Sequence, residues 1–185
     1  MRRVVVCAFG IACLAASAPA EARPIGGAVS GGHAGRGPDD GLLLGVDGAW
    51  ANTFGDGSDS SHDGWGFGVR AGYAFGSGLE LHLRYDDLGV EPAGARSPVQ
   101  LATAGLRYSV PFLFPMPFAE VDAGPAFVLG DVDFGAGGAL GLTFPVVNHV
   151  LVDVAAHDWF VPIGGTIRQT LTVGLGLAVT FGGPR

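Results

Sequence analysis

The feature that most constrains this chain is an alternation of apolar and polar residues that recurs between residues 41 and 181. In 65–75 (WGFGVRAGYAF) large apolar residues take almost every second position, and in 79–86 (LELHLRYD) apolar residues alternate with charged residues and a histidine. A period of two places successive side chains on opposite faces of a β-strand. The pattern therefore predicts an all-β fold whose strands have one apolar face and one polar face.

Six further runs show the same alternation of apolar and polar residues, but less regularly. They are 41–54, 100–110, 118–129, 134–144, 150–160 and 167–181. Together they predict eight strands, close in length to the roughly 9–11 residues that a tilted strand needs to cross a bilayer. Short turns at 76–78, 111–117 and 145–149 alternate with longer connections such as 55–64, although 130–133 is tight. This alternation is typical of a transmembrane barrel with two unlike ends.

The N-terminal segment predicts export. Residues 1–22 begin with two arginines, continue with a short apolar run and end with small residues, so we expect a signal peptide cleaved after Ala20 or Ala22. The run is shorter than the ~20 residues of a membrane-spanning helix. Cys7 and Cys13 both lie in this segment, so the mature chain is expected to contain no cysteine.

The domain boundaries follow from the same patterns. Residues 23–40 are rich in glycine and show no period, which predicts a flexible periplasmic leader. Residues 41–181 form the predicted barrel, and 182–185 form a C-terminal tail.

Composition excludes some classes of protein. The net charge is −7 and the chain has no lysine, so no basic surface for nucleic acid is expected. Glycine supplies 33 of the 185 residues, well above the average of about 7%. An eight-stranded barrel is just wide enough to be filled by side chains, so bulky inward residues on some strands require small residues on others.

The polar face carries the candidate functional residues. These form a predicted lumen charge network of Asp47, Arg70, Glu80, His82, Arg84, Asp86, Arg107, Glu120, Asp122, Asp153 and His157. The other residues of that face are mostly glycine, alanine and threonine, which suit a crowded interior better than a solvated exterior. We expect Arg107 to pair with Glu120, Asp122 or Glu80, and Arg70 to lie beside Asp47.

The apolar face is rich in aromatic residues near the ends of the runs. The predicted aromatic girdle consists of Trp50, Trp65, Tyr73, Phe75, Tyr85, Tyr108, Phe127, Phe144, Phe160 and Phe181. Aromatic rings prefer the membrane–water boundary. A membrane barrel should therefore point Leu81, Leu83, Val173 and Leu175 outward, whereas a soluble β-barrel or an open sandwich would bury them.

The export signal, the eight alternating runs and the apolar last run LTVGLGLAVTF (171–181) resemble the small outer-membrane β-barrel proteins of Gram-negative bacteria. That group includes the transmembrane domain of OmpA and OmpX. The resemblance covers about 41–181 and implies an antiparallel up-and-down barrel in the bacterial outer membrane. It also implies contact with outer-membrane lipid and lipopolysaccharide, assembly by the barrel assembly machinery, a monomeric state and no cofactor. Proteins of this group favour an aromatic residue at the end of the last strand as a signal to the assembly machinery. In this sequence Phe181 is followed by residues 182–185, so the aromatic residue is not terminal.

Three functions remain open on the sequence. A salt-bridged lumen favours a structural or surface-interaction role, because buried charges must be paired. The alternative is a small gated channel for water or ions, and the excess of acidic residues would favour cations. A third reading is a lipid A-modifying enzyme, which would use His62 with Ser61 or Asp63.

The residues favour the non-enzymatic reading. The predicted lumen is charged, whereas the lipid A palmitoyltransferase PagP has an apolar pocket for an acyl chain. His157 also lacks the nearby serine of the deacylase PagL. The acidic stretch 55–64 could hold a hard cation such as calcium, but its spacing does not match a known calcium loop, so no metal site is predicted.

Overall fold

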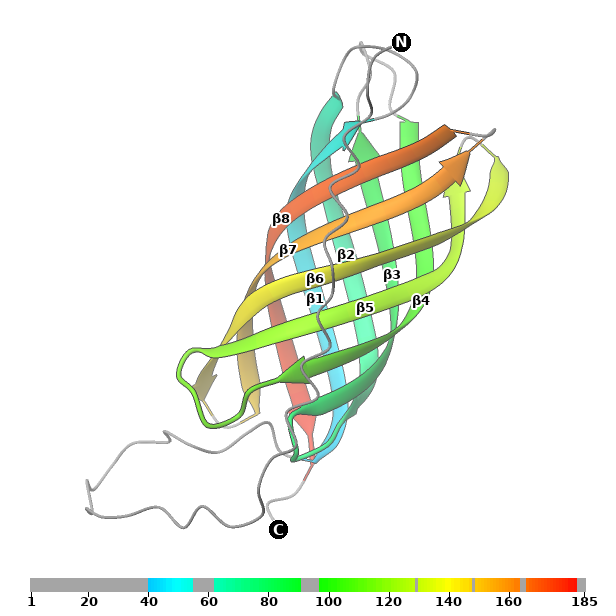
Figure 1. Ribbon diagram of the computed structural model, residues 1–185. Helices are drawn as coiled ribbons and strands as arrows, with labels where there is room; N and C mark the ends of the chain where they lie inside the picture. The colour runs from blue at the N-terminus through cyan, green and yellow to red at the C-terminus, as the bar shows by residue number, and fades with distance from the viewer. Residues whose placement is uncertain are drawn as a thin grey trace, which may run out of the picture. The chain divides into compact units, whose positions relative to one another are not determined.

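The chain folds into a closed barrel of eight antiparallel strands in sequence order (Figure 1). The computed structural model describes residues 40–54, 62–90, 97–128, 130–147, 149–163 and 166–182. The strands are β1 (Gly41–Phe54), β2 (His62–Ala74), β3 (Leu79–Val90), β4 (Ser97–Ser109), β5 (Met116–Val128), β6 (Asp131–Val147), β7 (Val150–Ile163) and β8 (Thr166–Phe181). The predicted fold class is confirmed, while the predicted signal peptide and nearly all of the predicted leader lie outside the described residues.

The barrel closes because the first and last strands pair along most of their length. The register between β1 and β8 runs from Leu42 opposite Phe181 to Phe54 opposite Gln169. Closure leaves no sheet edge, so the backbone groups of the strands bond to one another, as a hydrocarbon environment requires. Within the described ranges, no helix is long and apolar enough to cross a bilayer.

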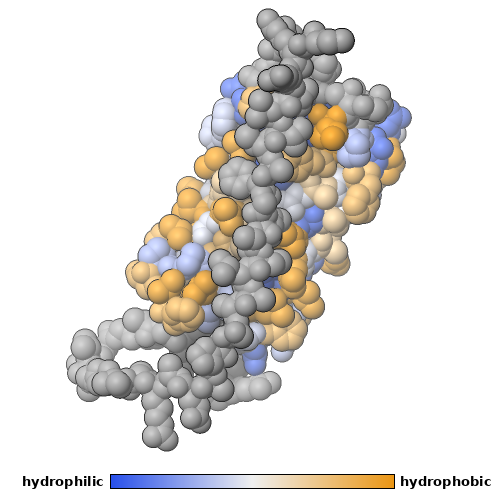
Figure 2. Space-filling model, in the orientation of Figure 1, coloured by the Kyte–Doolittle hydropathy of each residue, from blue (hydrophilic) through white to orange (hydrophobic). Residues whose placement is uncertain are grey.

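The outer wall of the barrel is apolar. Leu83 is 67% exposed and Leu175 is 64% exposed, and Leu81 and Val173 are also exposed, as predicted. Orange side chains dominate the visible wall in Figure 2. Soluble monomers rarely expose a continuous apolar surface of this kind. The arrangement is therefore that of a barrel with its apolar face outward, and the soluble barrel with an apolar interior is excluded.

The predicted girdle residues lie on this outer wall, but not all at its ends. Trp50 pairs in register with Trp65 near the ends of their strands. Tyr73 and Phe181 lie near the opposite end of the barrel. Tyr85 differs from the girdle expectation, because it lies midway along β3 between β2 and β4.

The apolar wall leads to a prediction for Leu83, which lies in the middle of β3 opposite Ala71 and Ala104. Leu83→Arg should lower the free energy of unfolding in phospholipid vesicles by about 2–4 kcal/mol, because a guanidinium there must leave water. Val132→Arg, at an exposed position near the start of β6, should cost only about 0–1 kcal/mol. Urea titration followed by tryptophan fluorescence measures both, and equal tolerance at the two positions would contradict a lipid-facing wall.

Candidate functional site

The predicted lumen residues all point into the barrel. Ten of the eleven are buried, and the Asp47 side chain is 20% exposed. They come from β1, β2, β3, β4, β5 and β7. Strand alternation and closure are together sufficient to bring them into one space.

Glycines on neighbouring strands make room for these side chains. Asp47 lies in register between Gly68 on β2 and Gly176 on β8. A Cβ added at Gly68 would come within 2.8 Å of the carboxylates of Asp47 and Asp86. The excess of glycine therefore reflects packing of the lumen, as the sequence predicts.

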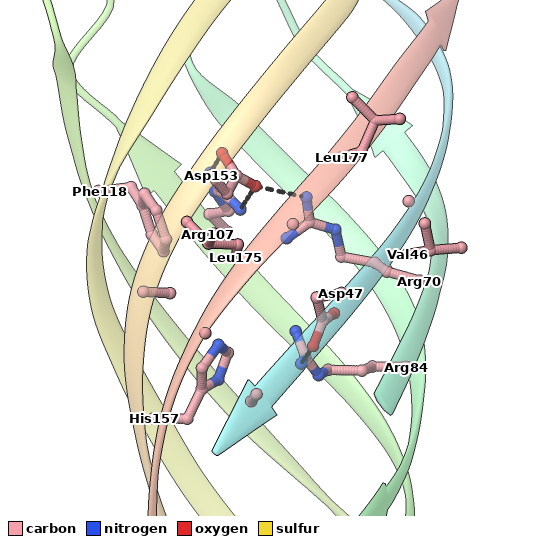
Figure 3. Close-up of a pocket in the computed structure, with 15 residues that line it drawn as sticks. Val46, Asp47, Arg70, Arg84, Arg107, Phe118, Asp153, His157, Leu175 and Leu177 are labelled. Atoms are coloured by element: carbon pink, nitrogen blue, oxygen red, sulfur yellow. Dashed lines mark hydrogen bonds and ion pairs between the residues drawn. The ribbon is translucent and has the colours of Figure 1, made fainter. Parts of the chain in front are cut away.

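Asp153 on β7 is the centre of the best-bonded part of the lumen (Figure 3). Arg107 donates to both of its oxygens, at 2.8 and 2.9 Å, and Arg70 donates to Oδ2 at 3.0 Å. The Thr143 hydroxyl donates to Oδ1 at 2.7 Å. One carboxylate thus holds two guanidiniums that come from β2 and β4.

This pairing differs from the sequence expectation for Arg107. Its Nη1 lies 3.8 Å from Glu120, and its Nε lies 4.0 Å from Glu80, so the predicted partners are its weaker contacts. Glu80 and Glu120 lie on the strands adjacent to Arg107, whereas an arginine side chain is long enough to cross a narrow lumen. Asp153 was therefore missed as its main partner.

A second cluster surrounds Arg84 on β3. Its guanidinium donates to both oxygens of Asp86, at 2.8–3.0 Å, and to Asp47 at 2.8 Å. Arg70 and Asp47 line the same cavity, but Arg84 is the residue that donates to Asp47. Arg70 instead approaches Glu80 at 3.2 Å and donates to Asp153 at 3.0 Å.

An aromatic residue that the sequence analysis did not select also belongs to the lumen. Phe118 is buried, and the Arg107 Cζ lies 3.5 Å from the centre of its ring. A guanidinium over an aromatic face gains a favourable cation–π interaction. Phe118, Glu120 and Asp122 occupy every second position of β5, so they point to the same face. This spacing predicts that Phe118 also points into the lumen.

His82 on β3 lies among three carboxylates. Its Nε2 is 2.9 Å from Asp122 Oδ1 and 3.7 Å from Glu120 Oε1, while its Nδ1 is 3.3 Å from Glu80. The side chains of His82, Glu120 and Asp122 are fully buried. His157 has a different setting, because its ring stacks on Trp159.

Among the described residues, the inward charges lie in the middle of the barrel and buried apolar residues lie nearer its ends. Along β7 the inward residues run from Leu151 through Asp153 and His157 to Trp159. Buried apolar clusters therefore lie above and below the charges. One is Leu88, Val99, Leu101, Ala126, Val128, Trp159 and Val161, and the other is Leu43, Ala74, Leu151 and Ala178. These inward residues were not predicted, because apolar residues at the strand ends change the alternation of apolar and polar residues only slightly.

Little empty space remains between the charged side chains. The cavity beside Asp47, Arg70, Arg84 and Arg107 measures about 20 Å³. That volume accommodates about one water molecule. The middle of the lumen is therefore a packed ionic layer, and a buried apolar cluster lies toward each end of the barrel.

Most of the loop residues considered for catalysis or calcium binding lie outside the described residues. Ser61 lies outside the described residues, as does most of 55–64. His62 begins β2, and Asp63 follows it on the exposed rim of the barrel.

Comparison with known proteins identifies the fold. No protein-family model matches the sequence, and no curated protein matches it either. Among solved structures, Neisserial surface protein A is 20% identical, with a TM-score of 0.64 over 76% of this chain and 97% of that one.

Two further structures are similar at lower scores. OprG of Pseudomonas aeruginosa is 12% identical, with a TM-score of 0.48 over 78% of this chain and 99% of that one. Ail of Yersinia pestis in a bilayer nanodisc is 13% identical, with a TM-score of 0.49 over 76% of this chain and 99% of that one. The likeness to the Neisserial protein carries the conclusion that this chain has the fold of the eight-stranded outer-membrane barrels.

Proposed function

We propose that this protein is a monomeric barrel of the bacterial outer membrane that acts structurally or through its surface, and not by conducting solutes. Its apolar wall, including Leu83 and Leu175, faces outward and suits lipid. The resemblance to small outer-membrane barrels supports the same location, with assembly by the barrel assembly machinery and contact with lipopolysaccharide.

The observation that carries this proposal is the sealed lumen. An ion crossing the barrel would have to pass both apolar clusters and displace the guanidiniums of Arg70 and Arg107 from Asp153. Breaking a buried, hydrogen-bonded charge pair costs about 3–5 kcal/mol. A lumen with about 20 Å³ of space among paired charges, and with apolar clusters toward both ends, favours a structural element over a pore.

The lumen also supports a non-enzymatic role. The cavity of about 20 Å³ is too small for an acyl chain. His157, the buried histidine considered for catalysis, stacks on Trp159 with ring centroids 6.2 Å apart. Lipid A from cells that express the protein should therefore keep its mass.

Conductance in a planar bilayer tests the sealed lumen. The protein should give no single-channel steps, and Arg107→Ala should give none either, because the apolar clusters remain when the ionic layer is weakened. A known porin measured in the same bilayer confirms that the assay detects open channels. Steps in the wild type, or steps that appear only in Arg107→Ala, would favour the alternative of a gated cation or water channel.

Cysteine labelling tests the same seal without electrical recording. Cys7 and Cys13 are the cysteines of the sequence, so changing both to serine leaves a clean background. Thr172→Cys, at a position that is 2% exposed inside the barrel, should resist a charged thiol reagent until the protein is unfolded in urea. Asp131→Cys, at the exposed start of β6, should react in the folded protein. Equal reaction rates at the two positions would show that water reaches the lumen freely.

A further inference from the structure

The ionic layer of the lumen is not balanced by its own side chains. Among the residues of the predicted network, six carboxylates, those of Asp47, Glu80, Asp86, Glu120, Asp122 and Asp153, face three guanidiniums, those of Arg70, Arg84 and Arg107. Buried charge must be compensated, because removal from water is costly. The layer therefore requires further positive charge, in the form of protons or a bound cation.

The hydrogen bonding of Glu120 and Asp122 is incomplete. The ion pairs from Arg70, Arg84 and Arg107 to Glu120 measure 3.5, 3.6 and 3.8 Å, which is long for a charge-assisted hydrogen bond. Both oxygens of Glu120 and the Oδ2 of Asp122 are buried and accept no hydrogen bond. These oxygens can still accept a positive partner.

The donor atoms around them lie close enough together to hold a metal ion. One donor atom each from His82, Glu120 and Asp122 lies within 4.8 Å of the other two. In a tetrahedral zinc site with bonds of about 2.0–2.1 Å, donors lie about 3.4 Å apart, so modest side-chain movements would bring all three onto one ion. The separations from His82 Nε2, 2.9 and 3.7 Å, lie on either side of that value.

Two neighbouring residues fit the same interpretation. Glu80 lies 3.3 Å from the Nδ1 of His82, on the ring edge away from Asp122. A carboxylate in that position commonly orients a metal-binding histidine and makes it more basic. Gly105 lies in register between His82 and Asp122, and a Cβ there would collide with His82 Nε2 and Asp122 Oδ1. The absence of a side chain at 105 leaves both donors accessible to an ion.

We propose that His82, Glu120 and Asp122 bind one divalent transition-metal ion inside the barrel, with Glu80 orienting the histidine. One imidazole and two carboxylates suit ions such as Zn²⁺ or Co²⁺. The ion would supply the missing positive charge of the ionic layer. Because all three donor side chains are fully buried, we expect the ion to enter while the barrel folds. The site does not depend on the proposed membrane function.

The test is refolding of the full chain from urea into detergent with Zn²⁺ or Co²⁺, followed by a chelator wash. The wild type should retain about one ion per chain, as structural sites do. Elemental analysis measures the amount, and the Co²⁺ absorption spectrum reports its ligands. His82→Gln and Asp122→Asn should retain at least about tenfold less, and Glu80→Gln should weaken binding by about 10–100-fold.

Two further variants separate metal binding from folding. Gly105→Ala keeps every ligand but places a methyl group against two of them, so it should lose the ion. His157→Gln changes the other buried lumen histidine, which is not part of the donor group, and should keep the ion. The shift in gel mobility between heated and unheated samples shows which variants have folded.

The proposal fails if the folded wild type retains no metal after the wash, since protons would then balance the layer. It also fails if folded His82→Gln and folded Asp122→Asn retain as much metal as the wild type. Conductance is measured separately on the same samples, so failure of the metal site is distinguishable from failure of the sealed-lumen proposal.

Discussion

The small internal width of an eight-stranded barrel limits which side chains fit in the lumen of this protein. The interior is only wide enough for side chains, so large inward residues require small inward residues elsewhere on the wall. The row Gly72, His82, Gly105, Asp122 and Gly137, one residue from each of β2 to β6, shows the rule directly. Glycine on alternate strands thus allows long charged side chains to meet across the lumen, and it determines which of them can meet.

In this crowded lumen, the carboxylates differ in how well they are hydrogen-bonded. Asp153 is fully engaged by two arginines and a threonine, whereas Glu120 is approached by three arginines at long distances. Guanidiniums are planar and can satisfy only the carboxylates that match their geometry. The remaining acceptors gather around His82, where the contacts are shorter.

Much of this arrangement follows from the sequence, because a period of two fixes both the strands and the direction of each side chain. The outward leucines, such as Leu83, and the inward charges, such as Glu120, are predictable in this way. The partners are not predictable, because Arg107 reaches Asp153 across the barrel and strand adjacency does not describe that distance. Trp159 and Leu43 lie toward the two ends of the ionic layer, and they were not predicted. An apolar residue at an inward position makes the alternation of apolar and polar residues less regular, but does not show that this residue is buried.

The contacts of Asp153 also have a consequence for the order of assembly. Its partners Arg70 and Arg107 lie 83 and 46 residues earlier in the chain. Such distant contacts form late, since the entropy of closing long loops must be overcome first. Until β7 is in place, the two arginines face water or an open sheet, and they lose that hydration only when their partner arrives. The ionic layer is therefore completed late, when the seventh strand has joined the sheet.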